Sequence, residues 1–249
     1  MSDVREEYTR ENYPSFGKKY NGEKAVISLT SWKARINTVS KTLYSLLTQC
    51  PGFHIVLVLS EEEFPKMMDE LPDNLKLFVN NELIEVLWVY KNYKSFKKVL
   101  FTMDKYRTVP VISADDGCIY VKNFAEPLYD MWINNKTAII CNTLWDEKWA
   151  PGCGGGNGVI YPPFAFDSLG INCLNLFYKE LLKNPNDDRF IANLAKFCKI
   201  KIKKTQNINQ VFTDLKNNYG MSANRMYIKG INWHFYEYIE KTAKITGRL

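Results

Sequence analysis

Runs of apolar residues alternate with segments of helical periodicity along the first part of the chain. Apolar runs of strand length occur at 24–30, 54–59, 84–89, 109–113 and 137–143. A strand that is covered on both faces is apolar throughout, so these runs predict the buried strands of a sheet. Apolar residues at helical spacing predict helices over 36–49 and 96–106. This alternation predicts an α/β fold with a mostly parallel sheet flanked by helices.

The second half of the chain has a less regular pattern. Helical spacing occurs around 174–182, 190–197 and 211–219, and 221–249 carries a further apolar stripe with basic residues between. Alternating lysines and isoleucines at 199–203 indicate an edge strand whose lysines face solvent. Neither a linker nor an internal repeat divides the sequence, so we expect one domain over 1–249 with a helical C-terminal annex.

Composition narrows the classes of protein that the chain can belong to. The 249 residues are 46% hydrophobic and 24% charged, as in a globular protein with a sizeable core. The N-terminus is charged and no segment has the roughly 20 apolar residues of a membrane span, so a cytoplasmic location is expected. Six cysteines without a CxxC pair are expected to be reduced, and two histidines give little support to a histidine triad or metal site. Carboxylates are therefore the expected acid–base groups.

The net charge of +6 gathers in two basic clusters, at 91–98 and 196–204. Such clusters can attract nucleic acid, a phosphorylated small molecule or an anionic membrane surface. No recognition helix or RNA-binding motif accompanies them, so no nucleic-acid partner is expected. Solvent-facing lysines of the predicted edge strand explain the second cluster.

An acidic pair, Asp115 and Asp116, follows the apolar run at 109–113. The carboxyl ends of parallel strands meet at one edge of a sheet, where ligands of open α/β folds bind. Neighbouring carboxylates repel one another, and a Mg²⁺ or Mn²⁺ ion that also holds a diphosphate would relieve the repulsion. The alternative is that both aspartates cap the turn that follows.

Two other features of the sequence can carry chemistry. Glycines gather at 152–158, where they allow close approach of the backbone but match neither the dinucleotide-binding nor the P-loop pattern. The turn at 184–188 precedes a predicted helix and contains Asp187 and Asp188. Either aspartate can cap that helix, and either can instead be a catalytic base.

Six segments together resemble the bacterial and viral nucleotide-sugar glycosyltransferases of GT-A fold that carry an extended DxD element. The segments are VISLTSWKARI, IVLVLSEEEFP, YKSFKKVLFTMDKY, VISADDGCIY, GGGNGVIYPP and the NDD turn. They occur in the expected order and cover roughly 24–220. The resemblance implies a Rossmann-like nucleotide-binding half over 24–143, an acceptor-side half over 144–220 and a tail over 221–249.

The resemblance also implies which residues form the nucleotide-sugar site. They are Thr30, Ser31, Arg35, Lys94, Lys97, Lys98, Asp115, Asp116, Gly156 and Tyr161. If the basic segment is helical, Lys94, Lys97 and Lys98 share one face. Trp149 is expected to help shape the sugar and acceptor pocket, because aromatic rings stack on sugars.

Metal binding is where the sequence departs from the family pattern. The acidic motif of close relatives reads ADDD, and here its third acid, the usual metal ligand, is Gly117. Asp116 and Asp115 remain as ligands for Mn²⁺ or Mg²⁺, so metal dependence stays open. With a weakened ion, Arg35 or the lysines at 94–98 could stabilise the leaving diphosphate instead.

The activity that the resemblance implies is glycosyl transfer of the hexosyl type, from a nucleotide-diphosphate donor to a hydroxyl of a glycan or lipid-linked acceptor. We expect inversion, with Asp187 or Asp188 as general base, in surface polysaccharide (capsule or lipopolysaccharide) biosynthesis. A catalytically degenerate nucleotide- or sugar-binding protein is the alternative, and a nucleic-acid-binding module a weaker one. The tail at 221–249 either docks on the domain or contacts the inner face of the membrane peripherally.

Overall fold

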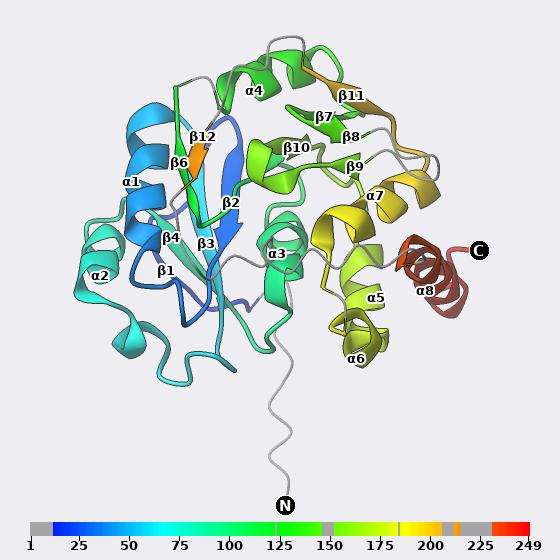
Figure 1. Ribbon diagram of the computed structural model, residues 1–249, viewed down its shortest axis with the longest axis horizontal. Helices are drawn as coiled ribbons and strands as arrows, with labels where there is room; N and C mark the ends of the chain where they lie inside the picture. Colours follow the sequence, from blue (N-terminus) through cyan, green and yellow to red (C-terminus); the bar gives the residue numbers. More distant parts are fainter. Residues whose placement is uncertain (1–11, 123, 146–151, 184, 206–211, 215–230) are drawn as a thin grey trace, which may run out of the picture.

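The protein is built around an eight-stranded sheet of order β1-β4-β3-β2-β5-β10-β7-β11, as a computed structural model shows (Figure 1). The structure describes residues 12–122, 124–145, 152–183, 185–205, 212–214 and 231–249. The strands of the main sheet are β1 (Ser15–Gly17), β2 (Val26–Thr30), β3 (His54–Ser60), β4 (Glu85–Val89), β5 (Val111–Ser113), β7 (Ile139–Cys141), β10 (Val159–Tyr161) and β11 (Ile202–Lys204). Two small ribbons pair β6 (Cys118–Tyr120) with β12 (Phe212–Asp214), and β8 (Leu144–Trp145) with β9 (Gly152–Cys153).

The centre of the sheet is parallel. β4, β3, β2 and β5 run in one direction, and β11 runs parallel to β7. β1 and β10 pair antiparallel with their neighbours. The predicted α/β class with a mostly parallel sheet is therefore confirmed.

Helices cover both faces of the sheet (Figure 1). The α-helices are α1 (Val39–Gln49), α2 (Asp73–Asn80), α3 (Lys97–Lys105), α4 (Glu126–Ile133), α5 (Leu169–Leu176), α6 (Tyr178–Leu181), α7 (Asp187–Phe197) and α8 (Ile231–Ile245). Short 3₁₀ turns in the described residues are η1 (Met67–Glu70), η2 (Lys94–Phe96) and η3 (Gly155–Asn157). α1 and α2 lie on one side of the parallel strands, and α3 and α5 lie on the other.

Alternate residues of the central strands enter two separate apolar cores. In β2, Ile27 and Leu29 join the core beneath α1 and α2, whereas Val26 joins the core beneath α3 and α5. Successive side chains of a strand point to opposite faces, so a strand between two helical layers has no face left for polar residues. This burial explains the apolar runs of the sequence.

The prediction of a helix over 211–219 is wrong where the structure describes it. Phe212–Asp214 forms β12, which pairs antiparallel with β6 through the couple Phe212 and Tyr120. Apolar spacing over so short a segment does not decide between helix and strand, and the unpaired backbone of β6 gives the strand its hydrogen bonds. The predicted edge strand at 199–203 exists as β11, shifted slightly along the chain and last in the sheet order.

The C-terminal helix α8 packs on the domain against α5 and α7. Its residues Phe235, Ile239 and Ala243 are buried in the core that contains Phe190 and Leu194. The docking predicted for the tail is thus present in 231–249, and contact with a membrane stays a prediction. None of the helices that the structure describes is long and apolar enough to cross a bilayer.

Gly158 should be sensitive to substitution, because it lies between η3 and β10 with a φ of +93°. A Cβ there would lie 2.7 Å from Phe124 and 2.9 Å from Leu128. Gly158→Ala should lower the free energy of unfolding by roughly 2–4 kcal/mol, through backbone strain and overpacking together. Gly22→Ala is the control, since Gly22 also has a positive φ but has no atom within 4 Å of an added Cβ. Equal losses in urea unfolding would show that the collision contributes nothing.

Candidate active site

Polar side chains converge at the edge where the parallel strands end. β2 leads into Ser31, β3 into Glu63, β4 into Asn92 and β5 into Asp116. Each of these follows a buried apolar strand, so the strand fixes its position while the side chain stays at the rim of the sheet. This is the edge at which open α/β sheets bind ligands.

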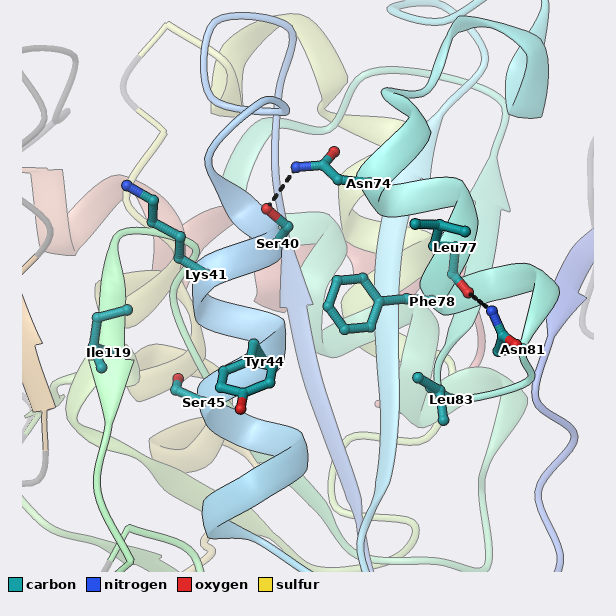
Figure 2. Close-up of a pocket in the computed structure, with 10 residues that line it drawn as sticks. All are labelled: Ser40, Lys41, Tyr44, Ser45, Asn74, Leu77, Phe78, Asn81, Leu83 and Ile119. Atoms are coloured by element: carbon teal, nitrogen blue, oxygen red, sulfur yellow. Dashed lines mark hydrogen bonds between the residues drawn. The ribbon is translucent and has the colours of Figure 1, made fainter.

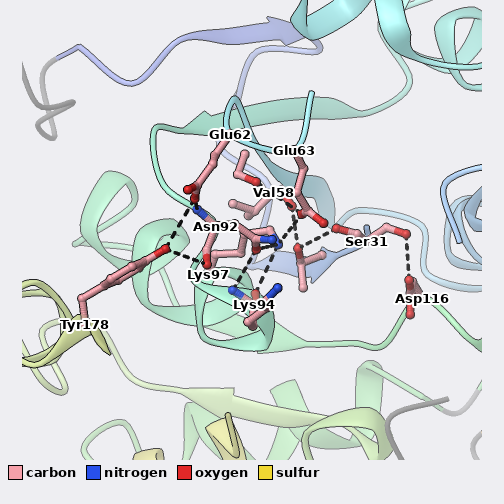
Figure 3. Close-up of polar contacts among 11 residues, drawn as sticks. Ser31, Val58, Glu62, Glu63, Asn92, Lys94, Lys97, Asp116 and Tyr178 are labelled. Atoms are coloured by element: carbon pink, nitrogen blue, oxygen red, sulfur yellow. Dashed lines mark hydrogen bonds and ion pairs between the residues drawn. The ribbon is translucent and has the colours of Figure 1, made fainter. Parts of the chain in front are cut away.

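The carboxylate of Asp116 is fixed by hydrogen bonds to both of its oxygens. It is buried, and its Oδ2 accepts a 2.7 Å hydrogen bond from Ser31 Oγ, which Figure 3 shows. Its Oδ1 accepts a 2.5 Å hydrogen bond from Arg35 Nη1. Burial raises the pKa of Asp116, against the lowering effect of Arg35 and Ser31. The backbone carbonyl of Asp116 accepts from Thr42 of α1, which fixes the loop as well as the side chain.

Lys98 of α3 joins two carboxylates that are distant in sequence. Its Nζ lies 2.7 Å from Asp115 Oδ1 and 2.9 Å from Asp187 Oδ2. The side chain is buried, and burial alone would lower its pKa, but Asp115, Asp187 and Asp188 raise it well above the usual value. Lys98 is therefore a permanent cation that ties β5, α3 and α7 together.

The aspartates of the NDD turn are not the caps of α7, contrary to one of the two predictions for them. Asn186 is the N-cap, and its Oδ1 accepts a 3.1 Å hydrogen bond from the Arg189 amide. Asp187 and Asp188 occupy the first turn of α7 instead, where the helix dipole favours acidic groups. Because Asn186 does the capping, both carboxylates turn toward the site.

The two aspartates differ in basicity. Burial alone would raise the pKa of Asp187, but the Lys98 ammonium lowers it below its usual value. Burial and the neighbouring Asp187 charge raise the pKa of Asp188 to about 8. Asp188 is partly exposed, and its Oδ1 accepts a 3.0 Å hydrogen bond from the Gly155 amide. The pair thus combines an ionised carboxylate with one that takes up a proton near neutral pH.

The glycine segment forms a wall of the site because it lacks side chains. A Cβ on Gly155 would lie 2.7 Å from Asp188 Oδ1, and one on Gly156 would lie 2.5 Å from Asp115 Oδ2. The wall is anchored to the sheet, since Ser113 Oγ donates to the Gly155 carbonyl and Tyr120 donates to the Gly156 carbonyl. The glycines predicted to allow close backbone approach do so against these carboxylates.

Lys94, Lys97 and Lys98 do not share one face, so that prediction is wrong. The segment bends at Lys94, an exposed residue of η2 whose φ is +52°. Lys97 is buried, with Nζ 3.3 Å from Asn92 Oδ1 and 3.5 Å from Glu63 Oε2 (Figure 3). Lys98 instead contacts Asp115 and Asp187. Burial lowers the pKa of Lys97 to about 8, although Glu63 opposes the shift. The surroundings of the two adjacent lysines therefore shift their pKa values in opposite directions, down for Lys97 and up for Lys98.

Two other predicted residues, Thr30 and Tyr161, pack within the domain. The Thr30 hydroxyl donates to the Val58 carbonyl at 2.7 Å and joins β2 to β3. Tyr161 is buried next to Phe166, with only a cavity of about 10 Å³ between it and Asp188, too small for a sugar. Trp149 lies outside the described residues. Contacts of Thr30 and Tyr161 with a donor stay predictions that this packing does not favour.

Sequence reasoning missed several residues that hold the site. Ser113 and Tyr120 anchor the glycine wall, and Glu63 and Asn92 hold Lys97. The sequence signal that could have identified Ser113 is its place as a polar residue within the apolar run at 109–113. Such a residue needs a hydrogen-bond partner across the fold.

The carboxylates of this edge do not fit a Mg²⁺ or Mn²⁺ site as they stand. Asp116 is paired with Arg35, and Asp115 is paired with Lys98, so each has its own cation. Among the described residues no group of three or more His, Cys, Asp or Glu side chains could hold a metal ion. The predicted role of Asp115 and Asp116 as metal ligands stays untested, and this arrangement does not favour it.

A separate hollow of about 560 Å³ lies between α1 and α2 (Figure 2). Tyr44, Leu77, Phe78 and Leu83 give it a largely apolar lining. None of the residues predicted for donor binding or catalysis is part of it. We therefore place the candidate active site at the edge of the sheet rather than in this hollow.

The raised pKa of Asp188 predicts a pH-dependent effect on stability. The neutral acid favours the folded state, so its contribution is complete below the unfolded-state pKa of about 4 and is lost as the pH rises to about 8. Asp188→Asn cannot ionise, so its melting temperature relative to wild type should rise between pH 4 and pH 8 and then level off. Asp73→Asn, at a fully exposed position, is the control for thermal unfolding. A pH-independent difference for Asp188→Asn would contradict the assignment.

Comparison with known proteins finds likenesses of structure but not of sequence. No protein-family model and no curated protein matches the sequence. Among solved structures, the glycosyltransferase GlyE of Streptococcus pneumoniae TIGR4 superposes with a TM-score of 0.51 at 10% sequence identity. The match covers 92% of this chain and 64% of GlyE, so the chain spans less than two thirds of that protein. At this identity the likeness shows that this chain and GlyE share a fold.

Proposed function

We propose that the protein is a glycosyltransferase that moves a sugar from a nucleotide-diphosphate donor to a hydroxyl group of a glycan or lipid-linked acceptor. The observation that carries the proposal is the meeting of Arg35, Lys98, Asp116 and the pair Asp187 and Asp188 at the carboxyl edge of the parallel strands. Cations suit a diphosphate leaving group, and a basic carboxylate suits an acceptor hydroxyl. The glycosyltransferase fold supports the same activity.

In the proposed reaction Asp188 is the general base. The acceptor oxygen attacks the anomeric carbon while its proton passes to the Asp188 carboxylate. The bond from the anomeric carbon to the phosphate oxygen breaks, its electron pair stays on the nucleoside diphosphate, and the configuration inverts. Asp188 suits this role better than Asp187, because a pKa of about 8 makes it the stronger proton acceptor. Asp187 positions Lys98 and, through its charge, keeps Asp188 basic.

The proposal also names an acceptor class and a pathway. Surface polysaccharide synthesis, of capsule or lipopolysaccharide, is the pathway that the sequence resemblance supports. A lipid-linked acceptor would bring the protein to the inner face of the membrane, with the tail at 221–249 as the contact. The apolar side of α8 is already packed on α5 and α7, so any membrane contact would involve its other side.

Release of nucleoside diphosphate from a panel of UDP-, GDP- and TDP-sugars, with and without simple acceptor glycosides, tests the proposal. Wild-type protein should consume one donor class, and acceptor should accelerate the release. Asp188→Asn should bind the same donor without consuming it. Binding without release in wild type would favour the alternative of a nucleotide- or sugar-binding protein, and neither binding nor release would contradict the proposal.

A further inference from the structure

Arg35 occupies the space beside the acidic pair that a larger residue at position 117 would fill. A Cβ on Gly117 would lie 3.3 Å from Arg35 Nη1 and 3.7 Å from its Cζ. The guanidinium reaches this place from the turn before α1, which is closed by hydrogen bonds from the Arg35 and Ile36 amides to the Trp32 carbonyl. A glycine at position 117 therefore allows a fixed cation to lie against Asp116.

The guanidinium of Arg35 uses only part of its hydrogen-bonding capacity. Nη1 donates to Asp116 Oδ1, and the side chain is only 16% exposed. Its Nε is buried and has no hydrogen-bond partner in the part of the chain that the structure describes. A buried N–H without an acceptor is costly, and phosphate oxygens match the planar fork of a guanidinium. The geometry of Arg35 is thus that of an anion-binding group held in place by Asp116.

A divalent cation would meet an unfavourable electrostatic field beside Asp115 and Asp116. Arg35 pairs with Asp116 and Lys98 pairs with Asp115, so each cation already neutralises one carboxylate. An incoming ion would have to break both pairs and stand next to two positive charges. Fixed cations can stabilise a leaving diphosphate by the same electrostatic interaction as a metal ion.

We infer that Arg35 takes the place of a divalent metal ion, so that the protein binds the diphosphate of its donor without a metal. This inference rests on the proposed function, because it concerns the same donor. Ser31 and Asp116 are positioning residues in this account, since Asp116 accepts a hydrogen bond from Arg35 Nη1 and Ser31 holds Asp116 in turn. Gly117 leaves the guanidinium room in this arrangement, because an added Cβ would lie 3.3 Å from Arg35 Nη1.

Calorimetric titration with UDP, GDP, TDP and ADP, each in EDTA and in Mn²⁺, tests the inference. We expect the nucleotide that binds to show a Kd that differs by less than about twofold between the two conditions. Arg35→Ala should weaken its binding about 10–100-fold, the loss expected for a charged hydrogen bond. Binding of the parent nucleoside, which has no phosphate, should change much less. Lys33→Ala, an exposed neighbouring cation, is the matched control.

A second variant tests the inference even if Arg35→Ala fails to fold. Gly117→Asp keeps Arg35 but places a carboxylate against its guanidinium, so it should weaken nucleotide binding in EDTA while thermal unfolding shows a folded protein. Nucleotide binding by wild type in Mn²⁺ that disappears in EDTA would overturn the inference and leave the proposed function standing. Failure of the folded protein to bind any nucleotide in either condition would overturn both.

Discussion

Replacement of Asp188 by Asn should lower the turnover number about 10²–10⁴-fold, the usual contribution of a general base. The amide keeps the shape of the side chain and can still accept the hydrogen bond from Gly155, but it cannot take a proton. Donor affinity should therefore stay close to that of wild type. Steady-state kinetics with the donor identified by the release assay, together with donor titration, measure the two effects separately.

The pH profile of the same reaction distinguishes the two aspartates. With Asp188 as base, kcat/KM should increase with pH and level off near pH 8, where the free enzyme loses the last proton from that residue. With Asp187 as base, the profile would be flat above pH 5, because Lys98 keeps its carboxylate ionised. Asp187→Asn should lower the pKa of Asp188 and move the rise to lower pH. Normal turnover in both Asn variants would contradict a role for the NDD turn in catalysis.

Loss of Lys98 should destabilise the protein more than loss of any other lysine in the site. Lys98→Ala leaves Asp115, Asp187 and Asp188 without their shared buried cation, and removing one partner of such a pair costs about 3–5 kcal/mol. For a chain of this size the melting temperature should fall by roughly 6–20 °C. Thermal unfolding at pH 7 measures the change.

Lys97→Met is the matched control for this prediction. Lys97 is the adjacent residue and equally buried, but its Nζ lies 3.2–3.5 Å from its partners and burial lowers its pKa to about 8. A side chain whose charge is already disfavoured loses little when an apolar one of similar length replaces it. Equal destabilisation by both substitutions would contradict the distinct roles assigned to the two lysines.

The parallel core could be predicted because burial on both faces leaves a direct signal in the sequence. The run at 24–30 contains β2 and the run at 54–59 covers all but the last residue of β3, and the two strands pair in register from Val26 and His54 onward. Short elements at the periphery carry no such signal. Three-residue β1 and β10 depend on partners that are far away in the chain, and residues 212–214 form a strand only because β6 lies beside them.

The convergence of several predicted residues at one edge could be foreseen from the sequence, but their pairing could not, and their roles stay predictions. The order of the motifs brought Arg35, Lys98, Asp116 and the NDD turn to one edge. Which cation meets which carboxylate depends on where the chain bends, as it does at Lys94, and on which residue caps α7. Neither feature follows from side-chain spacing on an ideal helix, so the roles of Lys97 and Asn186 emerged only from the structure.

Thermal unfolding of the protein with UDP-, GDP-, CMP- and TDP-sugars tests the central claim most directly, that the edge of the sheet is a nucleotide-sugar site. A ligand that binds only the folded state raises its stability in proportion to RT ln(1 + [L]/Kd), so no acceptor is needed. The account predicts that one class of nucleotide sugar raises the melting temperature, in wild type and in Asp188→Asn alike. The absence of a shift with every donor, at millimolar concentration, would contradict it.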